Sequence, residues 1–234
     1  MASHFGIATL GAGTRTNSSF IVPASAPTSA IAIIHLDVEN DVTPTPPSGY
    51  TQLQNIDHTA QPVDQWIWWK RLGAGEGGTT HTVTHASTWT NGALVVVQDV
   101  SASVNPTVSA PAQGTSTTYT ANSVTPIGNN AYIGYFGNSF QDMGTLMSPP
   151  AGTTPTFTEQ YESANNVYVA DGTLATAGAT GTKAPSAGSS VDWMASLVVV
   201  EDVATTGDPF PAGYGRPRRR TRSFVSPRRQ TVRR

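Results

Sequence analysis

Apolar and polar residues alternate over short runs along most of the chain, and turn residues separate these runs. This two-residue period predicts β-strands, and no long stretch has the 3.6-residue apolar period of a helix. Residues 94–97 and 197–200 are continuously apolar, which predicts central strands buried on both faces. The predicted strands cover residues 19–22, 30–38, 50–55, 65–72, 80–86, 93–100, 117–121, 131–137, 154–161, 166–170, 178–184 and 192–200.

The predicted strands fall into two similar halves. The turn motif Pro-Pro-x-Gly ends at Gly49 and again at Gly152, and the run Leu-Val-Val-Val-x-Asp-Val carries Asp99 and then Asp202. Both pairs are 103 residues apart, so we predict a repeat over about residues 14–100 and 113–203. Turn residues separate the predicted strands, and one such turn is expected at Asn91-Gly92.

These patterns predict an all-β fold, a jelly-roll-like β-sandwich built from two sequence-repeated halves. We expect one domain over residues 1–204, with two separate small domains as the alternative, followed by an extended arm over residues 205–234. Buried positions should include Leu94, Val96, Trp193, Leu197 and Val199. The absence of cysteine excludes disulfides and thiolate metal sites. No apolar run reaches the roughly 20 residues of a membrane-spanning helix, so we expect no membrane insertion.

Charge divides the chain into an acidic body and a basic arm. Residues 1–204 hold 14 carboxylates and four cations, whereas residues 205–234 hold nine arginines and one aspartate. Arginine binds carboxylates and phosphates in a bidentate manner. We therefore predict that the arm binds an acidic protein surface, and weigh this against a solvated tail and against nucleic acid, which we consider unlikely. The predicted partner-binding residues are Arg216, Arg218, Arg219, Arg220, Arg222, Phe224, Arg228 and Arg229.

Several motifs occur in a fixed order and carry a family resemblance. A Pro-Pro-x-Gly-Tyr turn ending at Tyr50 precedes Trp-Ile-Trp-Trp-Lys-Arg at residues 66–71, and a threonine-rich strand and the run at residues 94–100 follow. The second half adds a Gly/Ala/Thr-rich segment at residues 175–182 and Trp193. This order resembles β-sandwich modules of tailed-bacteriophage virion proteins, particularly minor tail and surface-exposed components. The resemblance implies a non-enzymatic protein, and some members look like carbohydrate-binding modules.

The tryptophan segment is the most conspicuous candidate for ligand binding. On a strand, Trp66 and Trp68 share one face, and Trp69 lies on the other. Buried tryptophans would stabilise the core, whereas exposed ones could stack on sugar rings. We favour packing and keep Trp66, Trp68 and Trp69 as possible ligand-binding residues.

Polar clusters offer weaker candidates for metal binding. His81 and His85 share a strand face but lack a third ligand. Asp37, Glu39 and Asp41 alternate before a proline-rich turn and could bind calcium, but we favour a solvated acidic edge.

No nucleophile and base occur at a recognisable catalytic spacing, so we expect no enzyme activity and no cofactor. The expected function is a structural component of a phage virion, a minor tail or decoration protein that forms homo-oligomers. Its arm would anchor it to a neighbouring virion protein. The alternative function is a carbohydrate-binding module that adsorbs to host-cell glycans.

Overall fold

The computed structural model describes residues 1–141, 147–163 and 166–202, and every regular element among them is a β-strand. Residues Met1–Ala204 form one compact unit. The strands are β1 (Ser3–Ile21), β2 (Ile31–Glu39), β3 (Thr51–Asp57), β4 (Val63–Arg71), β5 (Thr80–Gln98), β6 (Thr107–Val108), β7 (Ala112–Thr118), β8 (Ala131–Ser139), β9 (Thr158–Glu162), β10 (Val167–Leu174) and β11 (Ser186–Val200).

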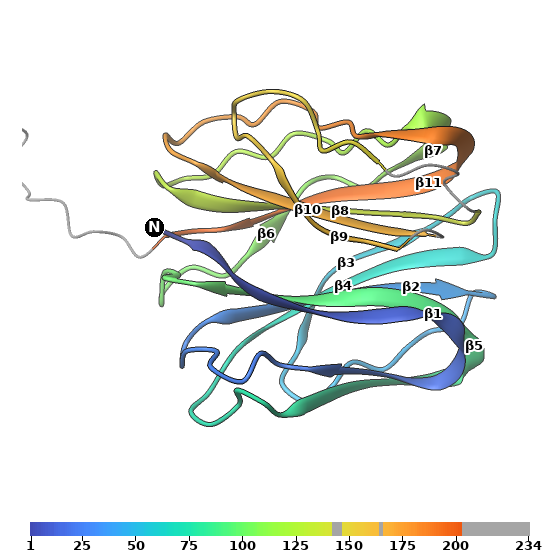
Figure 1. The fold of residues 1–234 in the computed structure, drawn as a ribbon, viewed down its shortest axis with the longest axis horizontal. Coiled ribbons are helices and arrows are strands. Elements are labelled where there is room, and N and C mark those ends of the chain that lie inside the picture. Colours follow the sequence, from blue (N-terminus) through green and yellow to red (C-terminus); the bar gives the residue numbers. More distant parts are fainter. Residues whose placement is uncertain (142–146, 164–165, 203–234) are drawn as a thin grey trace, which may run out of the picture. The chain divides into compact units, whose positions relative to one another are not determined.

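The strands form two antiparallel sheets, one from each half of the sequence, as Figure 1 shows. Sheet 1 has the order β1-β5-β2-β4-β3, and sheet 2 has the order β6-β11-β8-β10-β9, with β7 also paired to β11. Ile31 lies opposite Val97 in sheet 1, and Tyr132 lies opposite Val200 in sheet 2. The all-β class and the two packed sheets agree with the predicted β-sandwich.

A shared apolar core joins the two sheets. Alternate residues of β2, β4 and β5 face alternate residues of β8, β10 and β11, because side chains on a strand point to opposite faces in turn. Sheet 1 contributes Ile31, Ile33, Ile67, Ala93, Val95 and Val97, and sheet 2 contributes Tyr132, Phe136, Val167, Val169, Val198 and Val200. All of these side chains are buried.

Each sheet also packs a second core on its other face. In sheet 1, β1 and β5 curl together and return as an outer layer (Figure 1), which brings Phe20 and Val83 onto Ile34 and Trp68. In sheet 2, the segments around β7 and the long loops cover the outer face, where Trp193 is buried. Both faces of the central strands are therefore covered. This confirms the predicted burial of Leu94, Val96, Trp193, Leu197 and Val199.

The predicted turn at Asn91-Gly92 is wrong, because both residues lie inside the continuous strand β5. The Asn91 side chain, which would favour a turn on its own, accepts a hydrogen bond from the Gly92 N–H at 2.8 Å within the strand. Gly92 instead allows the backbones of β5 and β2 to lie close together, since a Cβ there would overlap the backbone carbonyl of His35. A glycine read as a turn signal can equally mark such a close approach.

Several further boundaries differ from the prediction, including those of β7, β9 and β11. Strand β1 runs over Ser3–Ile21, far beyond the predicted residues 19–22, because pairing with β5 overrides the low β-propensity of its glycines and serines. The predicted strand over residues 178–184 is not formed, and Lys183 in this segment makes an isolated bridge to Ala121. The predicted arm over residues 205–234 lies outside the described residues.

Candidate functional site

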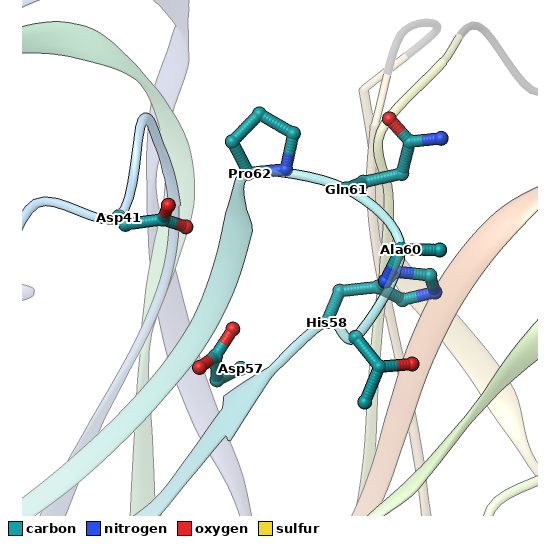
Figure 2. A pocket seen from close by; sticks show the side chains of 7 residues that line it. Asp41, Asp57, His58, Ala60, Gln61 and Pro62 are labelled. Carbon is teal, nitrogen blue, oxygen red and sulfur yellow. The ribbon is translucent and has the colours of Figure 1, made fainter.

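An open pocket lies at the end of sheet 1, beside the turn between β3 and β4. It has a volume of about 320 Å³ and is lined by Asp41, Asp57, His58, Thr59, Ala60, Gln61 and Pro62. Figure 2 shows the carboxylates of Asp41 and Asp57 on one side of this turn and the imidazole of His58 on the other. The Gln61 amide donates a hydrogen bond of 2.7 Å to Asp192 of β11, so the turn is attached to sheet 2.

Three carboxylates meet beside this pocket. One oxygen from each of Asp41, Asp57 and Asp64 lies within 4.8 Å of the other two. Asp57 and Asp64 face each other directly across the β3–β4 ladder, an arrangement that repulsion between like charges destabilises. Asp41 and Asp57 are exposed, whereas Asp64 is only 5% exposed. Burial, with repulsion from Asp57 as the next cause, raises the pKa of Asp64 to about 6.

This arrangement can hold a proton on Asp64, or it can attract a cation to three oxygen ligands of the kind that calcium prefers. The sequence analysis placed such a site at Asp37, Glu39 and Asp41. The structure separates these residues, because Asp37 is buried against sheet 2 and Asp41 joins Asp57 and Asp64 instead. Sequence reasoning missed Asp57 and Asp64, which lie just outside the predicted strands 50–55 and 65–72 and become neighbours through the register of β3 with β4.

Replacing Asp64 with asparagine should stabilise the protein at neutral pH. A buried carboxyl whose pKa rises from 3.8 to about 6 favours the folded state fully below pH 3.8 and loses that contribution as the pH rises to 6. At 1.36 kcal/mol per pKa unit, the unfolding free energy of Asp64→Asn relative to that of wild type should increase by about 3 kcal/mol from pH 3.5 to pH 7. Urea unfolding in EDTA at both pH values measures this gain. Asp99→Asn, at an exposed position, is the control. If the difference in unfolding free energy between Asp64→Asn and wild type were the same at both pH values, the prediction would be contradicted.

The tryptophan segment packs inside sheet 1. Trp66 and Trp68 are 8% and 1% exposed, and their rings stack at a centroid distance of 5.5 Å against the outer core. Trp69 lies on the opposite face and is partly buried against the core between the sheets. Stacking on a sugar requires an exposed ring face, so this placement favours the packing alternative for Trp66 and Trp68.

The two histidines of the threonine-rich strand have separate partners. Nδ1 of His81 lies 2.8 Å from the Tyr50 hydroxyl, and its Nε2 lies 3.2 Å from the Thr79 hydroxyl. His85 instead bonds to Ser18 at 3.0 Å. Glu76 lies beside His81 and forms an ion pair with Lys70. These satisfied contacts hold the loops at this end of sheet 1, and they do not bring His81 and His85 together as metal ligands.

The eight predicted partner-binding residues of the arm all lie outside the described residues. They are Arg216, Arg218, Arg219, Arg220, Arg222, Phe224, Arg228 and Arg229. Neither a protein-family model, nor a curated protein, nor a solved structure matches this chain. In the part of the chain that the structure describes, no helix is long and apolar enough to cross a membrane.

Proposed function

We propose that this protein is a non-catalytic structural component of a phage virion, a minor tail or decoration protein. Its arginine-rich residues 205–234 fasten the β-sandwich to an acidic surface of a neighbouring virion protein. The observation that carries the proposal is the charge division, with a net charge of −10 in residues 1–204 and +8 in residues 205–234. Opposite charges on two parts of one chain favour contacts between neighbouring subunits, because they steer association.

The two sheets support a duplicated building block. They share one strand order once β6 and β7 together are matched with β1. The glycines that end the two Pro-Pro-x-Gly turns, Gly49 and Gly152, both have positive φ, at 82° and 118°. In the first turn the Tyr50 N–H donates to the Pro47 carbonyl at 3.2 Å, which places Gly49 where a type II turn requires positive φ. We infer that the halves arose by duplication.

Deleting residues 205–234 should leave a folded β-protein that fails to enter particles. The strands and cores that the structure describes pack against one another within residues 1–202, so we expect circular dichroism and thermal unfolding to match the full chain. Incorporation into purified particles is measured by mass spectrometry. A matched control replaces the nine arginines of this segment by lysines, which keeps the charge but removes bidentate bonding.

Two outcomes test separate parts of the proposal. Normal incorporation of the truncated protein overturns the anchoring role of the arm. Attachment of the full chain that does not weaken with added salt contradicts its electrostatic basis, since salt screens exposed charges beyond about 10 Å at 0.1 M.

A further inference from the structure

The contact between the two sheets has a polar stretch between two apolar parts. The larger apolar part is the shared core described above, and the smaller one consists of Ile56 and Val63 of sheet 1 and Met194 of sheet 2. In the polar stretch, the inner face of β2 carries His35 and Asp37, both with no exposed surface. Buried ionisable groups without a charged partner are costly. The hydrogen bonds around these two residues therefore decide which protonation states the contact tolerates.

Gln65 and Asn138 connect the two sheets. The Gln65 side-chain amide of β4 donates to the Asn138 side-chain oxygen at 2.9 Å and to the backbone carbonyl of Phe136 at 3.2 Å. The Asn138 amide in turn donates to one oxygen of Asp37 at 2.7 Å. The other oxygen of Asp37 has no hydrogen-bond partner among the described residues.

Ser196 of β11 continues the network. Its hydroxyl lies 2.8 Å from the side-chain oxygen of Gln65 and also contacts the side-chain oxygen of Gln54. The Gln54 amide donates to the backbone carbonyl of Ser109 at 2.9 Å. Every one of these bonds crosses from sheet 1 to residues of the second half, so the network fastens one half to the other.

The network accommodates only the neutral form of His35. Its Nε2 lies 3.1 Å from the side-chain nitrogen of Gln65, a donor whose two hydrogens have Asn138 and Phe136 as acceptors. A hydrogen on Nε2 would find no acceptor there, so the geometry favours an unprotonated Nε2. Nδ1 then carries the ring hydrogen and has no partner among the described residues. A second proton would set an Nε2–H against the N–H groups of Gln65. Rotating the Gln65 amide would not help, because it would set the Gln65 oxygen against the oxygens of Asn138 and Phe136.

We propose that this polar stretch is an acid-labile joint, in which proton uptake by His35 parts the two sheets while each half keeps its own outer core. Burial lowers the pKa of His35 from 6.5 to about 3 in the folded protein. The folded state therefore loses stability as the pH falls below 6.5, and the loss is complete near pH 3. The outer cores include no part of the network and remain packed within each half.

Among the described residues near His35, no group supplies a negative charge that would compensate its protonated ring in acid. Asp37 is the closest carboxyl on the same strand, and burial raises its pKa well above the usual range, so it is neutral. Burial also raises the pKa of Glu39 and Asp64, the carboxyls next to Asp37. The network residues Gln65 of β4, Asn138 of β8 and Ser196 of β11 are uncharged. Asn91 of β5, which bonds to Ser163, is also uncharged.

Other titratable groups at the contact have partners of their own. Asp192 of β11 accepts the hydrogen bond from Gln61. Asp171 of β10 pairs with His4 of β1 at 2.7 Å, beside the shared core, and accepts a hydrogen bond from Tyr132. Tyr161 of β9 reaches Asn91 at 3.5 Å. The two tyrosines are neutral in acid because burial raises the pKa of both. Protonation of His35 would thus leave an uncompensated positive charge in the joint.

Hydrogen exchange of the full chain between pH 7 and pH 4 tests the joint. Once the sheets part, β2 and β8 lose the packing of their inner faces, so local opening of these strands costs less free energy. Their protection factors, corrected for the intrinsic pH dependence of exchange, should fall by up to about tenfold per pH unit below 6.5. They should hold in the outer layer, residues 13–21 and 80–88. His35→Gln should abolish the fall, since glutamine does not titrate. His81→Gln is the control, because His81 is a buried histidine bonded only within the first half.

An unchanged pH dependence in His35→Gln, or simultaneous loss of protection in the outer layer of wild type, overturns the proposal. If His35→Gln does not fold, His35→Leu replaces it, because Gln65 retains Asn138 and Phe136 as acceptors for both its hydrogens. The imidazole resonances of wild type give a further readout. A His35 resonance that titrates near pH 6.5 in the folded protein would equally overturn the proposal.

Discussion

Replacing Gly92 with alanine is expected to destabilise the protein by at least about 3 kcal/mol, the upper end of what overpacking costs. Gly92 lies in the interior of β5, between Leu10 of β1 and Leu36 of β2. An added Cβ would overlap the backbone carbonyl oxygen of His35 and lie 3.3 Å from Cα of Leu36. Backbone atoms in a hydrogen-bonded ladder cannot rotate away as a side chain can, so the strands must separate locally.

Gly11→Ala is the matched control for this substitution. Gly11 lies in the same sheet on the neighbouring strand, is exposed, and has no atom within 4 Å of the position of an added Cβ. Its replacement should change the unfolding free energy by no more than about 0.5 kcal/mol. Urea denaturation of both variants measures the difference. Equal stability of Gly92→Ala and Gly11→Ala would show that β5 is not continuous at this position, as a turn at Asn91-Gly92 would require.

The central strands could be predicted from the sequence because their patterns are local. Leu94 and Leu197 each open a continuously apolar run, and a strand with both faces covered needs no polar face. Likewise, the alternation of Trp66, Ile67 and Trp68 assigned these side chains to opposite faces, and the two cores occupy those faces. Patterns within one strand carry this information without knowledge of its neighbours.

The acidic pocket and the polar joint could not be predicted in the same way, because both depend on pairing or packing between strands and not on the pattern within one strand. Asp57 and Asp64 become neighbours only through the register of β3 with β4. From the sequence, Asp37 was a candidate calcium ligand or part of a solvated acidic edge, yet it faces Asn138, which is 101 residues away. A polar residue within an apolar strand has the same local pattern whether it faces solvent or a second sheet.

Phe136→Ala tests how firmly the sheets are joined, and is expected to cost about 3–5 kcal/mol. Phe136 has no exposed surface and lies in the core between the sheets. Its ring packs edge-on against His35 of the opposite sheet at a centroid distance of 5.5 Å. Alanine would remove these contacts and leave a cavity that the surrounding strands cannot fill. Ile127→Ala, at a position 77% exposed, should be neutral.

The form of the transition also distinguishes one domain from two. Because Phe136 belongs to sheet 2 but packs on sheet 1, its loss should lower the stability of both halves together. Hydrogen exchange of β4 and of β10, measured in sub-denaturing urea, should then report the same decrease in unfolding free energy. A decrease confined to β10 would mean that the halves unfold independently and that the shared core contributes little. The hydrogen bonds of Gln65 and Ser196 across the contact favour a single transition, because opening either half leaves the polar groups of the other unpaired.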